Sequence, residues 1–233
     1  MKFSIIIPAL NEQQGIQSCL LALQTFRDQA EIIVVDGGSH DHTATLAQAL
    51  ADKVLISEQG RAKQMNAGAA AAIGDTLVFL HADTFLPDHA LALIDDTAIW
   101  GRFDIRLTGS HWLLAVIAFM MNWRSRLTGI ATGDQAIFVT KAAFAAVNGY
   151  PNIALMEDIS LCKALKKLSP PLCLRAKVHS SARRWLAFGV IKIIFLMWSC
   201  RLGYFLGENP EVLARLYQQG RYWSPFRGFG KGG

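Results

Sequence analysis

The first third of the chain alternates between short apolar runs and mixed stretches. Apolar runs rich in β-branched residues predict buried strands at 3–8, 31–36, 53–57 and 76–80. The stretches between them predict helices at 12–24, 41–50 and 61–72. Continuous apolar strands separated by helices are typical of a parallel sheet covered on both faces. We therefore predict an α/β fold with a Rossmann-like, mostly parallel sheet flanked by helices.

The rest of the chain is less regular. Its pattern predicts strands at 98–107, 135–140 and 172–178, and helices at 111–123, 141–147 and 156–168. Asn209 and Pro210 have the residue types of an N-cap and a first helical turn, which predicts a last helix. We expect one domain over residues 1–180, a C-terminal extension of apolar helices over 181–220 packed on it, and a mobile tail over 221–233.

Two segments are unusually apolar. Residues 185–200, "WLAFGVIKIIFLMWSC", are apolar except for Lys192. A bilayer span needs about 20 predominantly apolar residues, so this run is too short and carries a charge. It predicts a helix that packs on the domain, on a partner, or in a membrane interface. The predicted helix at 111–123 is either core or a platform for a lipid-linked acceptor or a second copy.

Composition and charge narrow the class of protein. The 233 residues suit one sizeable domain, and the net charge of +5 favours anionic ligands or membrane surfaces. No basic helix, zinc-finger spacing or RNA-binding aromatic pattern is present, so we expect no nucleic-acid partner. Four scattered cysteines without a CxxC pair, and an amino terminus without a signal peptide, predict a cytoplasmic protein with reduced thiols. Peripheral contact with the inner face of the membrane stays open.

Polar side chains follow three of the predicted parallel strands. Asn11 and Glu12 follow the first strand, Asp36 ends the second, and His81 and Asp83 follow the strand at 76–80. Ligands of parallel sheets bind beyond the carboxyl ends of the strands, so these groups should gather at one edge. Glu12 also has a simpler explanation, because an acid is favourable at a helix N-terminus. No GxGxxG follows any strand, which argues against a dinucleotide site.

Four segments together resemble a known family. "SIIIPALNE", "EIIVVDGGSHDHT", "GRAKQMNAGAAAAIGDTLVFLHADT" and "GYPNIALMEDISLCKAL" resemble, in order and spacing, the family 2 glycosyltransferases over residues 3 to 170. The resemblance implies the GT-A fold and a nucleotide-sugar donor. "RFDIRLTG", "GIATGDQAIFV" and "SSARRW" are similar to the arsenosugar-biosynthesis or selenodomain-associated subgroup.

The resemblance implies a metal site in the triplet His81-Ala82-Asp83. Asp83 matches the carboxylate of an Asp-x-Asp motif that holds a divalent cation, Mn²⁺ or Mg²⁺, on the donor diphosphate. His81 stands where the family has its first aspartate. Mn²⁺ accepts an imidazole ligand more readily than Mg²⁺ does, so His81 either binds the cation or supports a neighbouring group.

The resemblance also implies roles for the remaining site residues. The donor nucleotide would be held by Pro8, Asn11, Glu12, Asp36, Gly37, Arg61 and Ala82. The donor sugar and the acceptor would meet Gly133, Asp134, Gln135, Arg183, Arg184 and Trp185. Asp158 would be the general base that takes the proton of the acceptor hydroxyl, and Glu157 would orient it or bind the acceptor. Acids at a helix N-terminus are the alternative explanation for this pair.

These observations predict a metal-dependent, inverting glycosyltransferase that moves a sugar from a nucleoside-diphosphate sugar to an unidentified acceptor hydroxyl. Two other classes stay open. His81 in the altered metal motif is compatible with a non-catalytic nucleotide-sugar binding protein. A sugar-nucleotide synthase shares a similar α/β core, but it usually has a Gly-rich loop with Arg and Lys where this chain has "PALNEQQG".

Overall fold

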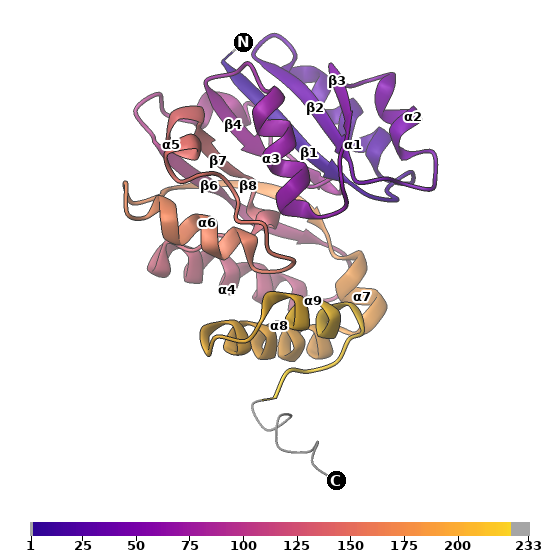
Figure 1. The fold of residues 1–233 in the computed structure, drawn as a ribbon, viewed down its shortest axis with the longest axis vertical. Helices are drawn as coiled ribbons and strands as arrows, with labels where there is room; N and C mark the ends of the chain where they lie inside the picture. Colours follow the sequence, from indigo (N-terminus) through magenta and orange to yellow (C-terminus); the bar gives the residue numbers. More distant parts are fainter. Residues whose placement is uncertain (1, 225–233) are drawn as a thin grey trace.

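The computed structural model describes residues 2–224, which form an eight-stranded sheet covered by helices (Figure 1). The strands lie in the order β3-β2-β1-β4-β7-β6-β8-β5. Their bounds are β1 Phe3–Ala9, β2 Ala30–Asp36, β3 Lys53–Ile56, β4 Thr76–Phe79, β5 Thr84–Phe85, β6 Trp100–Thr108, β7 Ile137–Thr140 and β8 Leu172–Ser181.

Most of the sheet is parallel, as the sequence predicts. β3, β2, β1 and β4 pair in parallel, and so do β6 and β8. β7 is antiparallel to both β4 and β6, and the two-residue strand β5 is antiparallel to β8. β8 therefore lies between β6 and β5, and β5 forms the edge of the sheet.

Helices cover both faces of the sheet. The α-helices are α1 Ile16–Leu23, α2 Thr43–Gln48, α3 Arg61–Ala71, α4 Leu113–Thr128, α5 Lys141–Ala146, α6 Glu157–Leu165, α7 Arg183–Phe188, α8 Val190–Phe205 and α9 Pro210–Gln218. Alternate residues of β1 enter two separate cores, because successive side chains of a strand point to opposite faces. Ile5 and Ile7 pack in the core that includes α1, and Ile6 packs in the core that includes α3.

Helix α3 lies unusually close to the sheet at Gly68. A Cβ atom at this position would lie 2.4 Å from Cγ2 of Ile6 and 3.1 Å from Cγ2 of Val35. Only glycine permits this approach, because real Cβ atoms do not reach such distances. The packing fixes α3 along β1 and β2, and it places the first turn of the helix near the carboxyl ends of those strands (Figure 1).

Polar contacts anchor α4 on β6. The side chain of Asn122 accepts a hydrogen bond of 2.8 Å from the backbone N–H of Ile105 and donates one of 3.0 Å to its carbonyl. Arg126 donates to both carboxylate oxygens of Asp104, at 2.8 and 2.9 Å, and the buried Arg102 also bonds Asp104. A bidentate arginine–carboxylate pair is geometrically specific. These contacts stabilise the C-terminal part of α4, which ends at Thr128, five residues past the predicted end.

The C-terminal helices form a separate layer at the bottom of Figure 1. The predicted last helix is confirmed: Oδ1 of Asn209 accepts from the backbone N–H of Glu211, with Pro210 in the first turn. Along residues 2–224, no helix combines the length and the hydrophobicity needed to cross a bilayer. The four cysteines are free, as predicted. Of the predicted tail 221–233, residues 225–233 lie outside the described residues.

Candidate functional site

The loops that follow β1 and β2 are bonded to each other. The backbone N–H of Asn11 donates to the hydroxyl of Ser39 at 2.9 Å, and Oδ1 of Asn11 accepts from the backbone N–H of His40 at 2.9 Å. The backbone N–H of Glu12 donates to Oγ1 of Thr43. Asn11 has a positive φ of 53°, which asparagine tolerates better than most residues. The two loops therefore form one rigid edge.

Asp36 organises the turn that follows it. Its Oδ2 accepts from the backbone N–H groups of Gly38 and Ser39, at 3.1 and 2.9 Å, and its Oδ1 accepts from the hydroxyl of Ser39. The side chain is 2% exposed. Both oxygens are thus already engaged inside the chain, and Asp36 shapes the loop at this edge whether or not it also meets a nucleoside.

Two residues of α3 connect the ends of β1 and β2 and the loop at Tyr150. The sequence analysis did not predict a role for either of them. Nε2 of Gln64 donates to the carbonyls of Ala9 and Val35, at 2.8 Å each, which joins the ends of β1 and β2. The amide of Asn66 bonds both the backbone N–H and the carbonyl of Tyr150, 84 residues away. Their amide groups satisfy backbone groups that strand ends and loops leave unpaired. They position the site rather than face it.

Glu12 and Arg183 close one side of the site. Nη2 of Arg183, in the first turn of α7, lies 3.0 and 3.2 Å from the two carboxylate oxygens of Glu12. This hydrogen bond raises the pKa of Arg183, and the charge of Asp83 adds to the effect. Asp83 therefore lies near this pair. Its half-buried carboxylate accepts no hydrogen bond from any residue of 2–224. The backbone carbonyl of Asp83 accepts from the N–H of Ser181.

His81 points to Asp134. Its Nδ1 donates to Oδ1 of Asp134 at 2.9 Å, and its ring lies against Gly133, where a Cβ atom would be 2.6 Å from Nε2. The backbone N–H of Gly133 donates to Oδ2 of Asp158 at 3.0 Å. Burial would raise the pKa of Asp134, but the hydrogen bond and the charge of His81 lower it below its ordinary value. A continuous chain of contacts thus runs from the end of β4 to α6.

Glu157 and Asp158 begin α6 and differ in environment. Glu157 is 7% exposed, and burial, followed by the charge of Asp158, raises its pKa to about 7. Asp158 accepts from Gly133 with one oxygen and from the backbone N–H of Ile159 with the other. Carboxylates with such different surroundings are typical of acid–base sites. The pair therefore offers one hydrogen-bonded carboxylate and one carboxyl that holds its proton near neutral pH.

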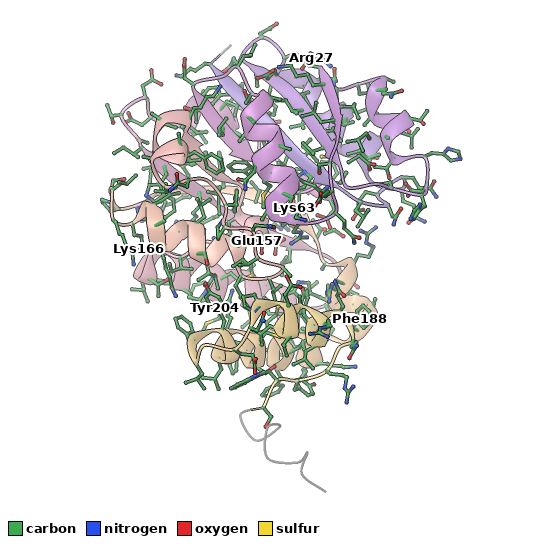
Figure 2. The ribbon with its side chains drawn as sticks, viewed as in Figure 1. Arg27, Lys63, Glu157, Lys166, Phe188 and Tyr204 are labelled. Atoms are coloured by element: carbon green, nitrogen blue, oxygen red, sulfur yellow. The ribbon has the colours of Figure 1, made fainter. Side chains whose placement is uncertain are left out.

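Arg61 faces the acidic residues. Desolvation would lower its pKa, but the carboxylates of Glu157 and Asp134 raise it above its ordinary value. Figure 2 shows Glu157 and Lys63, on the first turn of α3, in the middle of the molecule between the sheet and the C-terminal helices. Nζ of Lys63 pairs with the carboxylate of Glu58 at the exposed surface, 2.5 Å away, and so does not join Arg61 in facing the acidic residues.

Three predicted contact residues also make contacts within the chain. Gln135 is fully buried; its Nε2 donates to Ser125 of α4 at 3.1 Å, so it holds α4 and does not face a ligand. Arg184 lies over the ring of Tyr217 at 3.8 Å and donates to its carbonyl, which joins α7 to α9. Trp185 packs half-buried on the cores. Arg184 and Trp185 stay predicted contact residues, while the contacts of Gln135 are all made inside the core.

Other predicted residues lie where they can shape the same edge. Pro8 is half-buried in β1, and the buried Ala82 lies between His81 and Asp83. Gly37 lies against Gln64, whose amide would be 3.1 Å from a Cβ atom at that position. Across residues 2–224, no group of three or more His, Cys, Asp and Glu side chains is arranged to hold a metal ion. A cation here would need ligands from the donor as well.

The site also includes residues that the sequence did not point to. Arg124 on α4 and Arg201 on α8 lie near Asp158, and Tyr217 on α9 lies near Asp134 and Arg61. We use "strand-end site" for the side chains that these hydrogen bonds and charge interactions link. They are Glu12, Asp83, Arg183, His81, Asp134, Asp158, Glu157, Arg61, Arg124, Arg201 and Tyr217. The C-terminal helices therefore contribute to the site.

Known proteins resemble this chain in sequence and fold. Residues 4–107 match the family described as Glycosyl transferase family 2. A PGL/p-HBAD biosynthesis glycosyltransferase of Mycobacterium bovis is 31% identical over 166 residues, which cover 64% of this chain and 62% of that protein. An uncharacterized glycosyltransferase of Mycobacterium tuberculosis is 30% identical over 181 residues, which cover 70% of this chain and 68% of that protein. The match thus spans less than two thirds of the first relative.

A solved structure has the same fold. The mannosyltransferase PcManGT from Pyrobaculum calidifontis, in complex with GDP-Man and Mn²⁺, superposes with a TM-score of 0.65 at 17% identity. The superposition covers 93% of this chain and 68% of the other. It confirms the predicted GT-A architecture. Together with the sequence matches, it shows that the chain belongs to the family 2 glycosyltransferases.

Proposed function

We propose that the chain is a metal-dependent, inverting glycosyltransferase that moves a sugar from a nucleoside-diphosphate sugar to an acceptor hydroxyl. The observation that carries this proposal is the hydrogen-bonded chain His81–Asp134, Gly133–Asp158. It places a carboxylate from the start of α6 at the edge where the polar groups of β1, β2 and β4 lie. Family membership and the fold shared with a GDP-Man complex support a nucleotide-sugar donor.

Asp158 is the general base in this proposal. As the acceptor oxygen bonds to the anomeric carbon, the bond from that carbon to the diphosphate oxygen breaks, and the acceptor proton passes to Asp158. The N–H groups of Gly133 and Ile159 hold the carboxylate in place. Because a single displacement occurs at the anomeric carbon, the configuration inverts.

Asp83 is suited to a divalent cation. Mg²⁺ and similar cations are commonly held by one or two carboxylates together with substrate phosphates, so one uncommitted carboxylate suffices. His81 does not offer Nδ1, which donates to Asp134, so it orients Asp134 in this proposal. When bound, the cation would stabilise the negative charge that develops on the departing nucleoside diphosphate.

A donor-binding screen tests this proposal. Nucleotide sugars should raise the thermal stability of the chain in the presence of Mn²⁺ or Mg²⁺, by about 2.7 kcal/mol at a hundredfold excess over Kd. Asp83→Asn should remove the metal-dependent part of the gain. Asp88→Asn is a matched control, because Asp88 is exposed and makes no side-chain hydrogen bond within residues 2–224.

The products of the reaction separate the proposal from its rivals. Release of a nucleoside diphosphate with a sugar of inverted configuration supports it. Binding without any release would indicate a nucleotide-sugar binding protein, and pyrophosphate from a nucleoside triphosphate and a sugar phosphate would indicate a sugar-nucleotide synthase. Either result would contradict glycosyl transfer.

We also propose that α4 and α8 lie on a membrane surface, at the inner face. Each helix exposes a row of large apolar side chains at helical spacing, which places the row on one side. In Figure 1, α4 passes behind α6 and α8 passes behind α9. Such patches mark interaction sites, tryptophan is enriched at membrane interfaces, and the net charge of +5 favours anionic lipid. The rows are Trp112, Val116, Phe119, Met120, Trp123 and Leu127 on α4, and Ile191, Phe195, Trp198, Leu202 and Phe205 on α8.

Vesicle sedimentation tests the membrane contact. The double variant Trp123→Ser, Trp198→Ser should bind phosphatidylglycerol-containing vesicles at least about tenfold more weakly, since burying each large side chain is worth about 1.5–3 kcal/mol. Ile73→Ser is the control, because Ile73 is 63% exposed but lies before β4, away from both helices. A stable dimer that ignores vesicles, and that the double variant dissociates, would show that the two rows cover a second copy instead.

A further inference from the structure

Two arginines of the strand-end site have no role in the proposed reaction. Arg124 on α4 and Arg201 on α8 are both half-buried. Nη2 of Arg124 and Nε of Arg201 are shielded from solvent, and neither atom has a hydrogen-bond partner in the described part of the chain. Buried polar groups are normally paired, and an unpaired one is unfavourable. Nε of Arg102 is also unpaired, but the same guanidinium group is bonded to Asp104, whereas no side-chain hydrogen bond or ion pair of Arg124 or Arg201 is found in the described part of the chain.

The charges of the two guanidinium groups and of the proposed general base act on one another. Burial lowers the pKa of Arg124 to about 10, and the like charge of Arg201 is the next cause, while Asp158 opposes both. Burial also lowers the pKa of Arg201, against the charges of Asp158 and Asp134. Two cations held together in a partly desolvated place are unfavourable unless an anion joins them.

We propose that Arg124 and Arg201 form a subsite for an anionic group of the acceptor, a phosphate or a carboxylate, beside the hydroxyl that Asp158 deprotonates. This inference rests on the proposed function. Guanidinium groups bind such oxyanions through paired N–H donors in a fixed planar fork. One oxyanion between α4 and α8 would satisfy both unpaired nitrogens and offset the repulsion between the two cations. The acceptor would thereby be an anionic hydroxyl compound.

The donor diphosphate is a less suitable occupant. The cationic group beside the proposed metal carboxylate is Arg183, whose charged neighbours are Glu12 and Asp83. The acidic neighbours of Arg124 and Arg201 are instead Asp158 and Asp134. Arg124 and Arg201 thus lie on the side of Asp158, as Arg61 does, and not beside Asp83. An anion at Arg124 and Arg201 lies on the side of the base, where the acceptor must be.

Calorimetric titration with inorganic phosphate tests the subsite. The full chain is first saturated with a nucleoside diphosphate and Mg²⁺, so that the donor side is filled. Arg124→Gln and Arg201→Gln should each weaken phosphate binding at least about tenfold, because each removes one guanidinium group with its paired N–H donors. The double variant should lose phosphate binding. Arg175→Gln should change nothing, since Arg175 is exposed on β8 and makes no side-chain hydrogen bond within residues 2–224.

A vesicle arm identifies the source of the anion. If phosphatidic acid in phosphatidylcholine vesicles increases binding of the wild type but not of the double variant, the acceptor is lipid-linked. If phosphatidic acid makes no such difference while inorganic phosphate binds only with both arginines present, the acceptor is a soluble anion.

Equal phosphate affinity in the wild type and the double variant would overturn the inference, as would the lack of phosphate binding to the wild type at millimolar concentration. Both variants should unfold at the wild-type urea concentration or above it, because no described hydrogen bond is lost. Failure of the nucleoside diphosphate to bind would instead contradict the proposed donor site. Titration of phosphate into the unloaded chain would then still report on the arginines.

Discussion

Replacing Asp158 with asparagine is expected to slow sugar transfer by about 10²–10⁴-fold, the usual contribution of a positioned general base. Asparagine has nearly the same shape and keeps one oxygen for the N–H of Gly133, but it cannot take a proton. The proposed donor side, around Asp83 and Arg183, is untouched, so donor affinity should not change. The measurement is the rate of nucleoside-diphosphate release, with donor binding measured separately by calorimetry.

The control for this variant is Asp28→Asn. Asp28 is exposed and precedes β2, so it lies at the opposite end of the strand from the site. It should retain the wild-type rate. Transfer by Asp158→Asn at the rate of the control, with donor bound, would rule out Asp158 as the base and would direct attention to Glu157.

Glu157→Gln is expected to be more stable than the wild type at alkaline pH. This advantage in unfolding free energy should be smaller at acidic pH. The carboxyl group has an ordinary pKa of 4.5 and a folded pKa of about 7, so the folded state holds the proton more tightly. Wild-type stability contributed by this proton is present below pH 4.5 and is lost as pH rises to about 7. At about 1.36 kcal/mol for each pKa unit, the loss approaches about 3 kcal/mol. Glutamine stays neutral and avoids it.

Urea denaturation at about pH 5 and about pH 8 measures this difference. The advantage of Glu157→Gln over the wild type should grow between the two values. Glu211→Gln, at an exposed position in α9, should give no such pH dependence. A constant difference between Glu157→Gln and the wild type would mean that Glu157 is ionised in the folded chain across this range.

The hydrophobic pattern predicted the parallel half of the sheet because its strands are buried on both faces. β1 and β2 are nearly continuous apolar runs, and each is buried over almost its whole length. β5 escaped prediction because two residues carry no pattern, and it forms only by pairing with β8. The last part of α4 was also missed, because Arg124, Ser125 and Arg126 interrupt its apolar pattern. Contacts with distant residues keep that part helical.

The ordered motifs identified the acidic residues of the site but not all of their neighbours. Asp134 and Asp158 fall in segments that resemble the family, and the structure joins them through His81 and Gly133. Arg201 and Tyr217 were missed, because a helical pattern does not tell where a C-terminal extension folds back. The burial of Gln135 against α4 was not predicted, because its place in a motif does not reveal which way its side chain points. The arsenosugar subgroup stays a prediction.

The position of β8 between β6 and β5 determines the order in which the molecule can become active. The segment that carries Asp83 leads directly into β5, and β5 is held by β8 through the pairs Thr84–Ser180 and Phe85–His179. A growing polypeptide can therefore complete β1–β4 early, but β5, next to Asp83, can pair only after β8 has been synthesised. Long-range pairing of this kind is slow, so the metal site proposed at Asp83 should form late in folding. Incomplete chains would then have the parallel half of the sheet without the proposed metal site.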